Sequence, residues 1–203
     1  MNILHIDTCA LGDVTGSRQS TAAVVAAQCP DGTAHVVYRD LAAAPLSHIS
    51  GPLLQVLRQQ WDDSIPLNAE VRAEAMLSQS LLREFLDADL VVLAAPLYNF
   101  SIPSVLKAWL DRILHLAQAR QETQAANGAG TPAAGGKRLL LITSCCSPAD
   151  QPARQHMMDE HEQHLARVFR QLGIAHPEFL RIDTDDDGKL LMPDTLPGPA
   201  PAP

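Results

Sequence analysis

Aromatic side chains, paired cysteines and long apolar runs are scarce in this chain of 203 residues. Phe, Trp and Tyr together make up 4% of it, and its four cysteines form no CxxC pair. That cysteine spacing matches neither a zinc site nor a disulfide framework, so we expect reduced thiols. No apolar run approaches the roughly 20 residues that a helix needs to cross a bilayer. We therefore expect no contact with a membrane.

Positive charge is also in short supply. Lys and Arg number 15 against 23 Asp and Glu, which gives a formal net charge of −8. A nucleic-acid groove needs a basic stripe, so nucleic acid is not an expected partner. The first residues lack the basic segment of a secretory signal and become polar at once. These features predict a cytoplasmic protein that binds small molecules.

Short apolar segments alternate with amphipathic ones along the chain, which predicts a parallel sheet with helices on both faces. Five strands favour an α/β, flavodoxin-like fold with strand order 2-1-3-4-5. The expected strands are residues 2–6, 35–39, 90–95, 137–143 and 179–182, and the expected helices are 20–28, 53–61, 70–86, 103–116 and 153–172. Residues 121–136 are low in complexity and predict a mobile loop.

One domain accounts for nearly the whole chain. A hydrophobic fraction of 46% is enough for a full core, and no composition break marks a second domain. We expect a single flavodoxin-like domain over residues 1–192. Residues 193–203 are rich in proline and predict a disordered tail.

The most specific signal lies where the third expected strand ends. Residues 96–100 read Pro-Leu-Tyr-Asn-Phe, and a helix is expected to follow. Ligands of open α/β sheets bind beyond the carboxyl ends of the strands. Backbone N–H groups, one amide and flat apolar surface at such an exit suit a planar ring with polar edge atoms. A structural turn with two packed aromatic side chains is the alternative interpretation.

Two more loops are expected to share this crevice, because strands 1, 3 and 4 are neighbours in the predicted order. The first ends in Thr15-Gly16-Ser17-Arg18 at the start of a helix, where hydroxyl and free N–H groups favour a phosphate. An ordinary helix cap explains the same residues. The other loop, residues 143–148, reads Thr-Ser-Cys-Cys-Ser-Pro.

These motifs resemble the FMN-dependent NAD(P)H azoreductase and quinone reductase family, over residues 1 to about 179. Residues 96–100 are similar to the family's Pro-Met-Tyr-Asn-Phe, and residues 15–18 to its Ser-x-Ser-Arg. Cys9 stands where the family tends to have serine. The resemblance implies an FMN site made of Cys9, Thr15, Gly16, Ser17, Pro96, Leu97, Tyr98, Asn99, Phe100, Ser144, Cys145, Cys146 and Ser147.

The same resemblance implies a mechanism. NADH or NADPH reduces FMN, which then passes two electrons to a quinone, azo compound or similar planar acceptor in a ping-pong sequence. The cofactor carries the chemistry, so no side-chain acid or base is required. The resemblance also implies a homodimer. A narrower prediction is specialisation for a biosynthetic intermediate.

The chain departs from the family in three places. The family's Thr-Ser-Arg-Gly-Gly loop has lost both glycines, which Cys146 and Ser147 replace, so Cβ atoms stand where the ring edge is approached. Residues 121–136 lack the aromatic side chains that cover the flavin, and the proline-rich tail replaces the last helix. A second hypothesis is therefore a flavodoxin-like protein with weakened or lost FMN binding, which acts as a binding module or a non-redox enzyme. We interpret Cys145 and Cys146 as small buried residues, with a redox pair as the alternative.

The last expected helix carries His156, Glu160, His161 and His164 at spacings that would suit metal ligands. We interpret this set as a solvated or interface face and predict no metal. The resemblance sets His164 near a position commonly held by tyrosine. A histidine there could polarise a substrate oxygen, so His164 is a candidate substrate contact.

Overall fold

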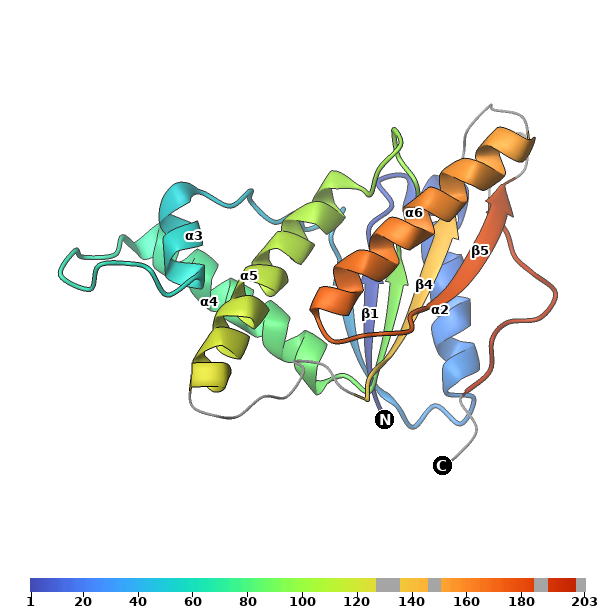
Figure 1. Cartoon of the computed structure of the whole chain (residues 1–203). Helices are drawn as coiled ribbons and strands as arrows, with labels where there is room; N and C mark the ends of the chain where they lie inside the picture. Colours follow the sequence, from blue (N-terminus) through green and yellow to red (C-terminus); the bar gives the residue numbers. More distant parts are fainter. Residues whose placement is uncertain (127–135, 146–150, 185–189, 200–203) are drawn as a thin grey trace.

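A parallel sheet with helices on both sides forms the body of the protein (Figure 1). The computed structural model describes residues 1–126, 136–145, 151–184 and 190–199. The parallel strands are β1 (Asn2–Asp7), β2 (His35–Asp40), β3 (Leu90–Ala94), β4 (Arg138–Ser144) and β5 (Glu178–Thr184). Their order is 2-1-3-4-5, which confirms the predicted flavodoxin-like arrangement. A short sixth strand, β6 (Leu190–Leu191), pairs antiparallel with β5 and was not predicted.

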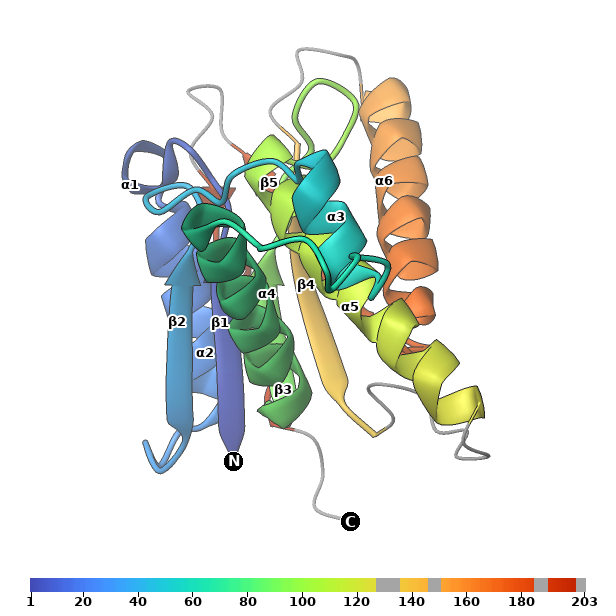
Figure 2. The same cartoon turned by 90° about the vertical axis from the view of Figure 1, so that its left-hand side faces the viewer.

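Helices cover the two faces of the sheet unequally. Those described are α1 (Gly12–Thr15), α2 (Ser17–Gln28), α3 (Gly51–Leu57), α4 (Ala69–Asp87), α5 (Ser104–Ala126) and α6 (Gln151–Gln171). Figures 1 and 2 show α4, α5 and α6 on one face and α2 on the other. Within the described ranges, no helix combines the length and the apolar character that a membrane crossing requires.

The helix ends follow local hydrogen-bonding rules. Asn68 caps α4, because its side-chain oxygen accepts a hydrogen bond from the backbone N–H of Val71 at 2.8 Å. α6 ends at Gln171, and Gly173, two residues further on, has a φ of 90°. Gly173 N donates to Arg170 O, and Ile174 N donates to Phe169 O, which is the paired pattern of a Schellman cap.

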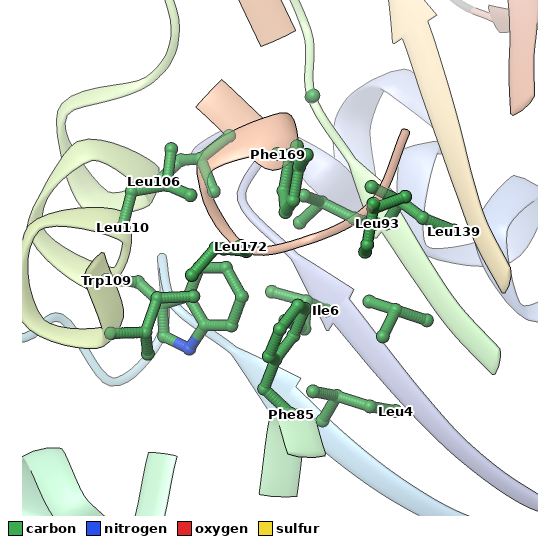
Figure 3. Packing of buried hydrophobic residues seen from close by; sticks show 14 of the residues in the cluster. Leu4, Ile6, Phe85, Leu93, Leu106, Trp109, Leu110, Leu139, Phe169 and Leu172 are labelled. Carbon is green, nitrogen blue, oxygen red and sulfur yellow. The ribbon is translucent and has the colours of Figure 1, made fainter. Parts of the chain in front are cut away.

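The main core lies between the sheet and the helices α4, α5 and α6. Figure 3 shows side chains from β1, β3, α4, α5 and α6 converging there. Phe85 and Trp109 meet edge to face, with ring centroids 6.0 Å apart. All five residues of β3 are buried, as expected for a central strand covered on both faces. A smaller core beneath α2 includes Val24, Val92 and Leu140.

A buried arginine joins α4 to α5 and to the segment before α3. The Arg112 side chain is fully buried, and its guanidinium donates to Ser78 Oγ at 3.0 Å and to Ser47 O at 2.8 Å. It also forms an ion pair with Glu74. Burial opposes ionisation of Glu74, but hydrogen bonds from Arg112 and Ser47 outweigh burial and lower the pKa of this carboxyl.

Two predicted helix ends are wrong. α5 continues to Ala126 instead of stopping at residue 116, so the first residues of the predicted loop 121–136 are helical. Glutamine, alanine and glutamate are good helix formers, which explains this extension. α3 ends at Leu57 instead of residue 61, and Gln59 has a φ of 57°, which breaks the helix. Residues 127–135 lie outside the described part of the chain.

The start of the proline-rich tail lies against the sheet. Leu196 packs on the smaller core, and the side-chain amide of Gln28 donates to the carbonyl oxygen of Pro197. These contacts argue for order in the described portion of the tail. The disorder predicted for residues 193–203 stays a prediction, and residues 200–203 are outside the described ranges.

Candidate functional site

The segments that follow β1, β3 and β4 meet at one end of the sheet. β3 pairs with β1 on one side and with β4 on the other, so the three segments leave the same edge. Figure 2 shows α1 and the connection from β3 to α5 at this end, opposite the N-terminus. Hydrogen bonds join the segment after β3 to each of the other two. Cys9 Sγ lies 2.8 Å from the Tyr98 hydroxyl oxygen, and Leu97 N donates to Ser144 O at 2.8 Å.

The segment after β1 ends in a glycine between two helices. Gly16 has a φ of 74°, a conformation that glycine adopts without strain, and α2 begins at the next residue. Ser17 is 5% exposed, and its hydroxyl has no hydrogen-bond partner among the described residues. Thr15 lies close by, but its hydroxyl donates to Leu11 O at 3.0 Å. The start of α2 thus offers backbone N–H groups and the Ser17 hydroxyl, which has no hydrogen-bond partner among the described residues.

Arg18 is already engaged by carboxylates. Its Nε donates to Asp40 Oδ2 at 2.6 Å, and its Nη1 lies 3.2 Å from Asp13 Oδ2. The hydrogen bond to Asp40 raises the pKa of the guanidinium, which stays charged. Burial opposes ionisation of Asp40, but hydrogen bonds from Arg18 and the following backbone outweigh burial and lower the pKa of that carboxyl. Arg18 therefore contributes little free positive charge to the site.

The segment after β3 forms a tight two-residue turn. Tyr98 N donates to Ser101 O at 2.8 Å, and Ser101 N donates to Tyr98 O at 2.9 Å. The two central residues, Asn99 and Phe100, have φ values of 46° and 66°. Two positive φ values are the signature of a type I′ turn, which favours Asn-Gly. Phenylalanine at the second position is strained, and its side chain is 83% exposed. The turn thus presents an aromatic ring to solvent at an energetic cost.

The segment after β4 is described only in part. Ser144 and Cys145 are both buried, and Cys145 packs with Leu97 and Met158. This packing agrees with the interpretation of Cys145 as a small buried residue. Cys146 and Ser147, which replace the expected glycines, lie outside the described residues. Pro96 is buried beside this segment.

The histidines of α6 lie in different environments. His156 is exposed, with its Nε2 3.6 Å from Glu160 Oε1, whereas His161 is 4% exposed and faces inward. His164 is exposed at the rim of a cavity. Over the described ranges, no three His, Cys, Asp or Glu side chains are arranged to hold a metal ion. The inward turn of His161 was not anticipated from the sequence.

A cavity of about 260 Å³ opens between α6 and the turn after β3. Its wall combines apolar side chains with hydroxyl, carboxylate and imidazole groups. The lining residues are Leu97, Phe100, Ser101, Met157, Glu160, His161 and His164. The cavity therefore offers a flat apolar surface with a few polar groups at its rim, which is typical of small-molecule sites.

A buried carboxylate at the end of β1 was missed by the sequence reasoning. Asp7 accepts hydrogen bonds from Thr21 Oγ1 at 2.8 Å and from the Tyr38 hydroxyl at 2.9 Å. The Nε2 atom of His5 lies 3.6 Å from Asp7 Oδ1. Burial and the bond to Asp7 raise the pKa of Tyr38 to about 12. The sequence did contain a signal for this cluster, because an aspartate at the end of an apolar strand is unusual and needs hydrogen-bond partners. This cluster fixes β1 against α2.

Known proteins resemble this chain over most of its length. The family model described as a flavodoxin-like fold matches residues 1–190. An FMN-dependent NADH:quinone oxidoreductase from Methylocella silvestris is 41% identical over 186 residues, which cover 90% of this chain and 87% of that protein. A protein of the same name from Cupriavidus necator is 42% identical over 184 residues, which cover 89% and 84%.

A solved structure shares the fold at lower identity. The FMN-dependent NADH-azoreductase from Bacillus anthracis, in complex with FMN, aligns with a TM-score of 0.66. It is 18% identical, and the alignment covers 93% of this chain and 89% of that one. At this identity the likeness concerns the fold alone. The family match and the identities near 40% mean that the chain belongs to the flavodoxin-like family that contains the FMN-dependent NADH:quinone oxidoreductases.

Proposed function

We propose that this protein is an FMN-dependent NAD(P)H oxidoreductase that passes two electrons to quinones, azo compounds or similar planar acceptors. The relatives named above carry this activity for NADH and quinone in their names. The observation that carries the proposal is the bonding of the three segments at one edge of the sheet. Cys9 bonds to Tyr98, and Leu97 bonds to Ser144, so an anion site and a flat turn lie side by side.

The start of α2 suits the phosphate of FMN. The first N–H groups of a helix point outward with a partial positive charge and bind anions. Ser17 adds a hydroxyl without a partner in the described structure, and the left-handed Gly16 turns the chain into the helix. The Thr15 hydroxyl would donate to the phosphate only if it left Leu11 O. Because Arg18 is held by two carboxylates, the phosphate would depend on these neutral donors.

The turn after β3 suits the ring system of FMN. The side-chain amide of Asn99 has no partner within the described residues, so it is available to a ligand with polar edge atoms. Tyr98 and Phe100 supply aromatic surface beside it, and Leu97 and Cys145 supply a buried apolar base. When bound there, FMN would supply the two-electron exchange between nicotinamide and acceptor. The chain's own role is to orient both partners and exclude water.

The cavity beside the turn suits the second substrate. Phe100 and Met157 offer surface for a planar ring, and His164 can donate a hydrogen bond to a carbonyl or azo group. One cavity for both nicotinamide and acceptor would give ping-pong kinetics. We also propose a homodimer in the cytoplasm. A preference for a biosynthetic acceptor stays a prediction.

The phosphate assignment can be tested by comparing FMN with riboflavin, which lacks the phosphate. Fluorescence quenching of each flavin by the purified protein gives its Kd. We expect FMN to bind at least about 100-fold more tightly than riboflavin, because charged hydrogen bonds contribute roughly 1.5–3 kcal/mol each. Ser17→Ala should weaken FMN binding and leave riboflavin binding unchanged. Ser80→Ala, a serine of α4 bonded to Glu84, is the control. Equal affinities for the two flavins would contradict the assignment.

The substrate assignment is tested by turnover. Oxidation of NADH and of NADPH is followed at saturating FMN with a quinone, and then with an azo dye. Initial rates at several fixed acceptor concentrations should give parallel double-reciprocal lines. His164→Leu should raise the KM for the acceptor and leave the KM for NADH unchanged. No effect on either KM would remove His164 from the site, and an equal effect on both would contradict a contact specific to the acceptor.

A further inference from the structure

The backbone at the end of β3 is held by side chains from two other segments. Thr8 Oγ1, after β1, donates to Ala94 O at 2.8 Å. The next residue, Ala95, still donates its N–H to Ile142 O of β4 at 2.8 Å. Its carbonyl oxygen leaves the sheet pattern and bonds to a side chain of α6. β3 therefore ends where two successive carbonyls, those of Ala94 and Ala95, bond to side chains instead of to a neighbouring strand.

That side chain is His161. Its Nε2 lies 2.8 Å from Ala95 O, and a carbonyl oxygen only accepts, so Nε2 carries the proton. Burial is the main cause that lowers the pKa of His161, with a smaller contribution from His164. The ring is thus neutral at pH 7, with its proton on Nε2 and its Nδ1 bare. It acts as a fixed, uncharged donor.

The position of His161 on its helix marks it as unusual. The inward row of α6 is Met158, His161, Leu165 and Phe169, at helical spacing. The other three are apolar and fill the core. A polar ring in such a row is costly unless it is hydrogen-bonded, and Ala95 O supplies that bond. The residue is placed to make one contact, at the point where the chain enters the turn.

We propose that His161 is a positioning residue that sets where the chain leaves β3 and so orients the Tyr98–Ser101 turn toward the cavity. The bond fixes Ala95, Pro96 follows without an N–H, and Leu97 is held by Ser144 O. The strained turn begins at the next residue. His161 also lines the same cavity, so it couples α6 to the turn. As a role in binding FMN, this inference rests on the proposed function.

The first test needs no flavin. Exchange of the backbone amide hydrogens of Leu97 and Ser101 is measured by NMR in the protein without FMN. Leucine is similar in size to histidine but has no hydrogen-bond donor. His161→Leu should therefore raise the exchange rate of both amides about tenfold. His161→Gln places a neutral N–H at a similar reach and should restore exchange toward the wild-type rate. His156→Leu, the same change at an exposed position of α6, is the matched control and should leave both rates unchanged.

The second test adds FMN. His161→Leu should raise the Kd for FMN about tenfold, the effect expected of one buried carbonyl left without a donor. His161→Gln should recover most of that affinity. If His161→Leu does not fold, His161→Asn replaces it, because the shorter amide does not reach Ala95.

The outcomes separate this inference from the proposed function. Unchanged exchange of Leu97 and Ser101 in the leucine variant overturns the positioning role, whether or not FMN binds. Failure of glutamine to rescue exchange also overturns it. If the wild-type protein does not bind FMN but the exchange results hold, the positioning role stands and the flavoenzyme proposal fails.

Discussion

The Cys9 sulfur lies 2.8 Å from the Tyr98 hydroxyl oxygen, and this contact joins the segment after β1 to the turn after β3. Cys9 is 5% exposed, so water does not compete strongly for the bond. Thr15 Oγ1 is 3.7 Å from the same sulfur. One thiol thus touches both the proposed phosphate end and the proposed ring end of the site.

Removing this thiol should loosen the turn. We expect Cys9→Ala to weaken FMN binding by about 1 kcal/mol, the net contribution of one hydrogen bond. Tyr98→Phe should have a similar effect, and the double variant should cost less than the sum, because both changes remove one interaction. Cys9→Ser should keep or improve affinity, since a hydroxyl is a stronger donor than a thiol. Flavin fluorescence gives each Kd.

Cys29→Ala provides the matched control, because Cys29 sits in the Asp31 turn between α2 and β2. It should leave the Kd unchanged. Fully additive effects of Cys9→Ala and Tyr98→Phe would mean that the contact does not contribute to binding.

Phe100→Gly should separate stability from function. Glycine relieves the strain of a positive φ, roughly 1–2 kcal/mol, but loses about 0.5–1 kcal/mol through the entropy of the unfolded chain. Urea unfolding should therefore give a free energy of unfolding equal to that of the wild type or up to about 1.5 kcal/mol higher. Acceptor turnover should fall, because the exposed ring is gone. A clear loss of stability together with unchanged turnover would show that Phe100 serves folding.

The hydrogen bonds and ion pair of Arg112 should contribute to the free energy of unfolding and not to ligand binding at the site. Arg112→Met removes the buried partner of an ion pair whose other side chain, Glu74, is 29% exposed, so we expect a loss below the roughly 3–5 kcal/mol typical of a fully buried pair. The pKa of Glu74 is lowered in the folded protein, so its contribution is present above the unfolded value of 4.5 and is lost as the pH falls through the folded pKa. The difference between wild type and variant should therefore shrink as the pH falls below about 4.5.

Urea unfolding at pH 7 and at a series of lower pH values measures this difference. Arg120→Met, an exposed arginine on the same helix, should change stability by less than about 0.5 kcal/mol. A difference that grows as the pH falls would contradict the assigned sign.

The tail contacts predict a measurable effect of truncation. Ending the chain after Met192 removes Leu196 from the smaller core and the Pro197 carbonyl from Gln28. We expect the free energy of unfolding to fall by about 1–2 kcal/mol, mostly from the apolar area of one leucine. Leu196→Ala in the full chain should account for much of that loss. No change on truncation would support the predicted disorder of the whole tail.

The sheet was largely predictable because its strands are apolar on both sides. β3 is a run of Leu, Val and Ala typical of a central parallel strand, and its place in the order 2-1-3-4-5 is the one predicted for a flavodoxin-like fold. The end of α5 was not predictable, because a glutamine- and alanine-rich segment suits both a helix and a loop. β6 has two residues and no pattern of its own.

The sequence predicted which segments form the site, but it did not predict the contacts between them. The motif at residues 96–100 located the turn, but nothing in its sequence showed that Phe100 adopts a positive φ. His161 was read as part of a surface row, because spacing on one helix does not reveal which face is buried. The partner of Cys9 is 89 residues away along the chain, and only the fold brings the two together.

The central claim is that the three segments hold a working flavin, and an anaerobic absorbance experiment tests it most directly. Purified protein is loaded with FMN, freed of excess, and mixed with NADH and then with a quinone. We predict a bound flavin spectrum that NADH bleaches and the quinone restores, in two separate steps. A protein that retains no flavin, or a flavin that NADH does not bleach, would contradict the account.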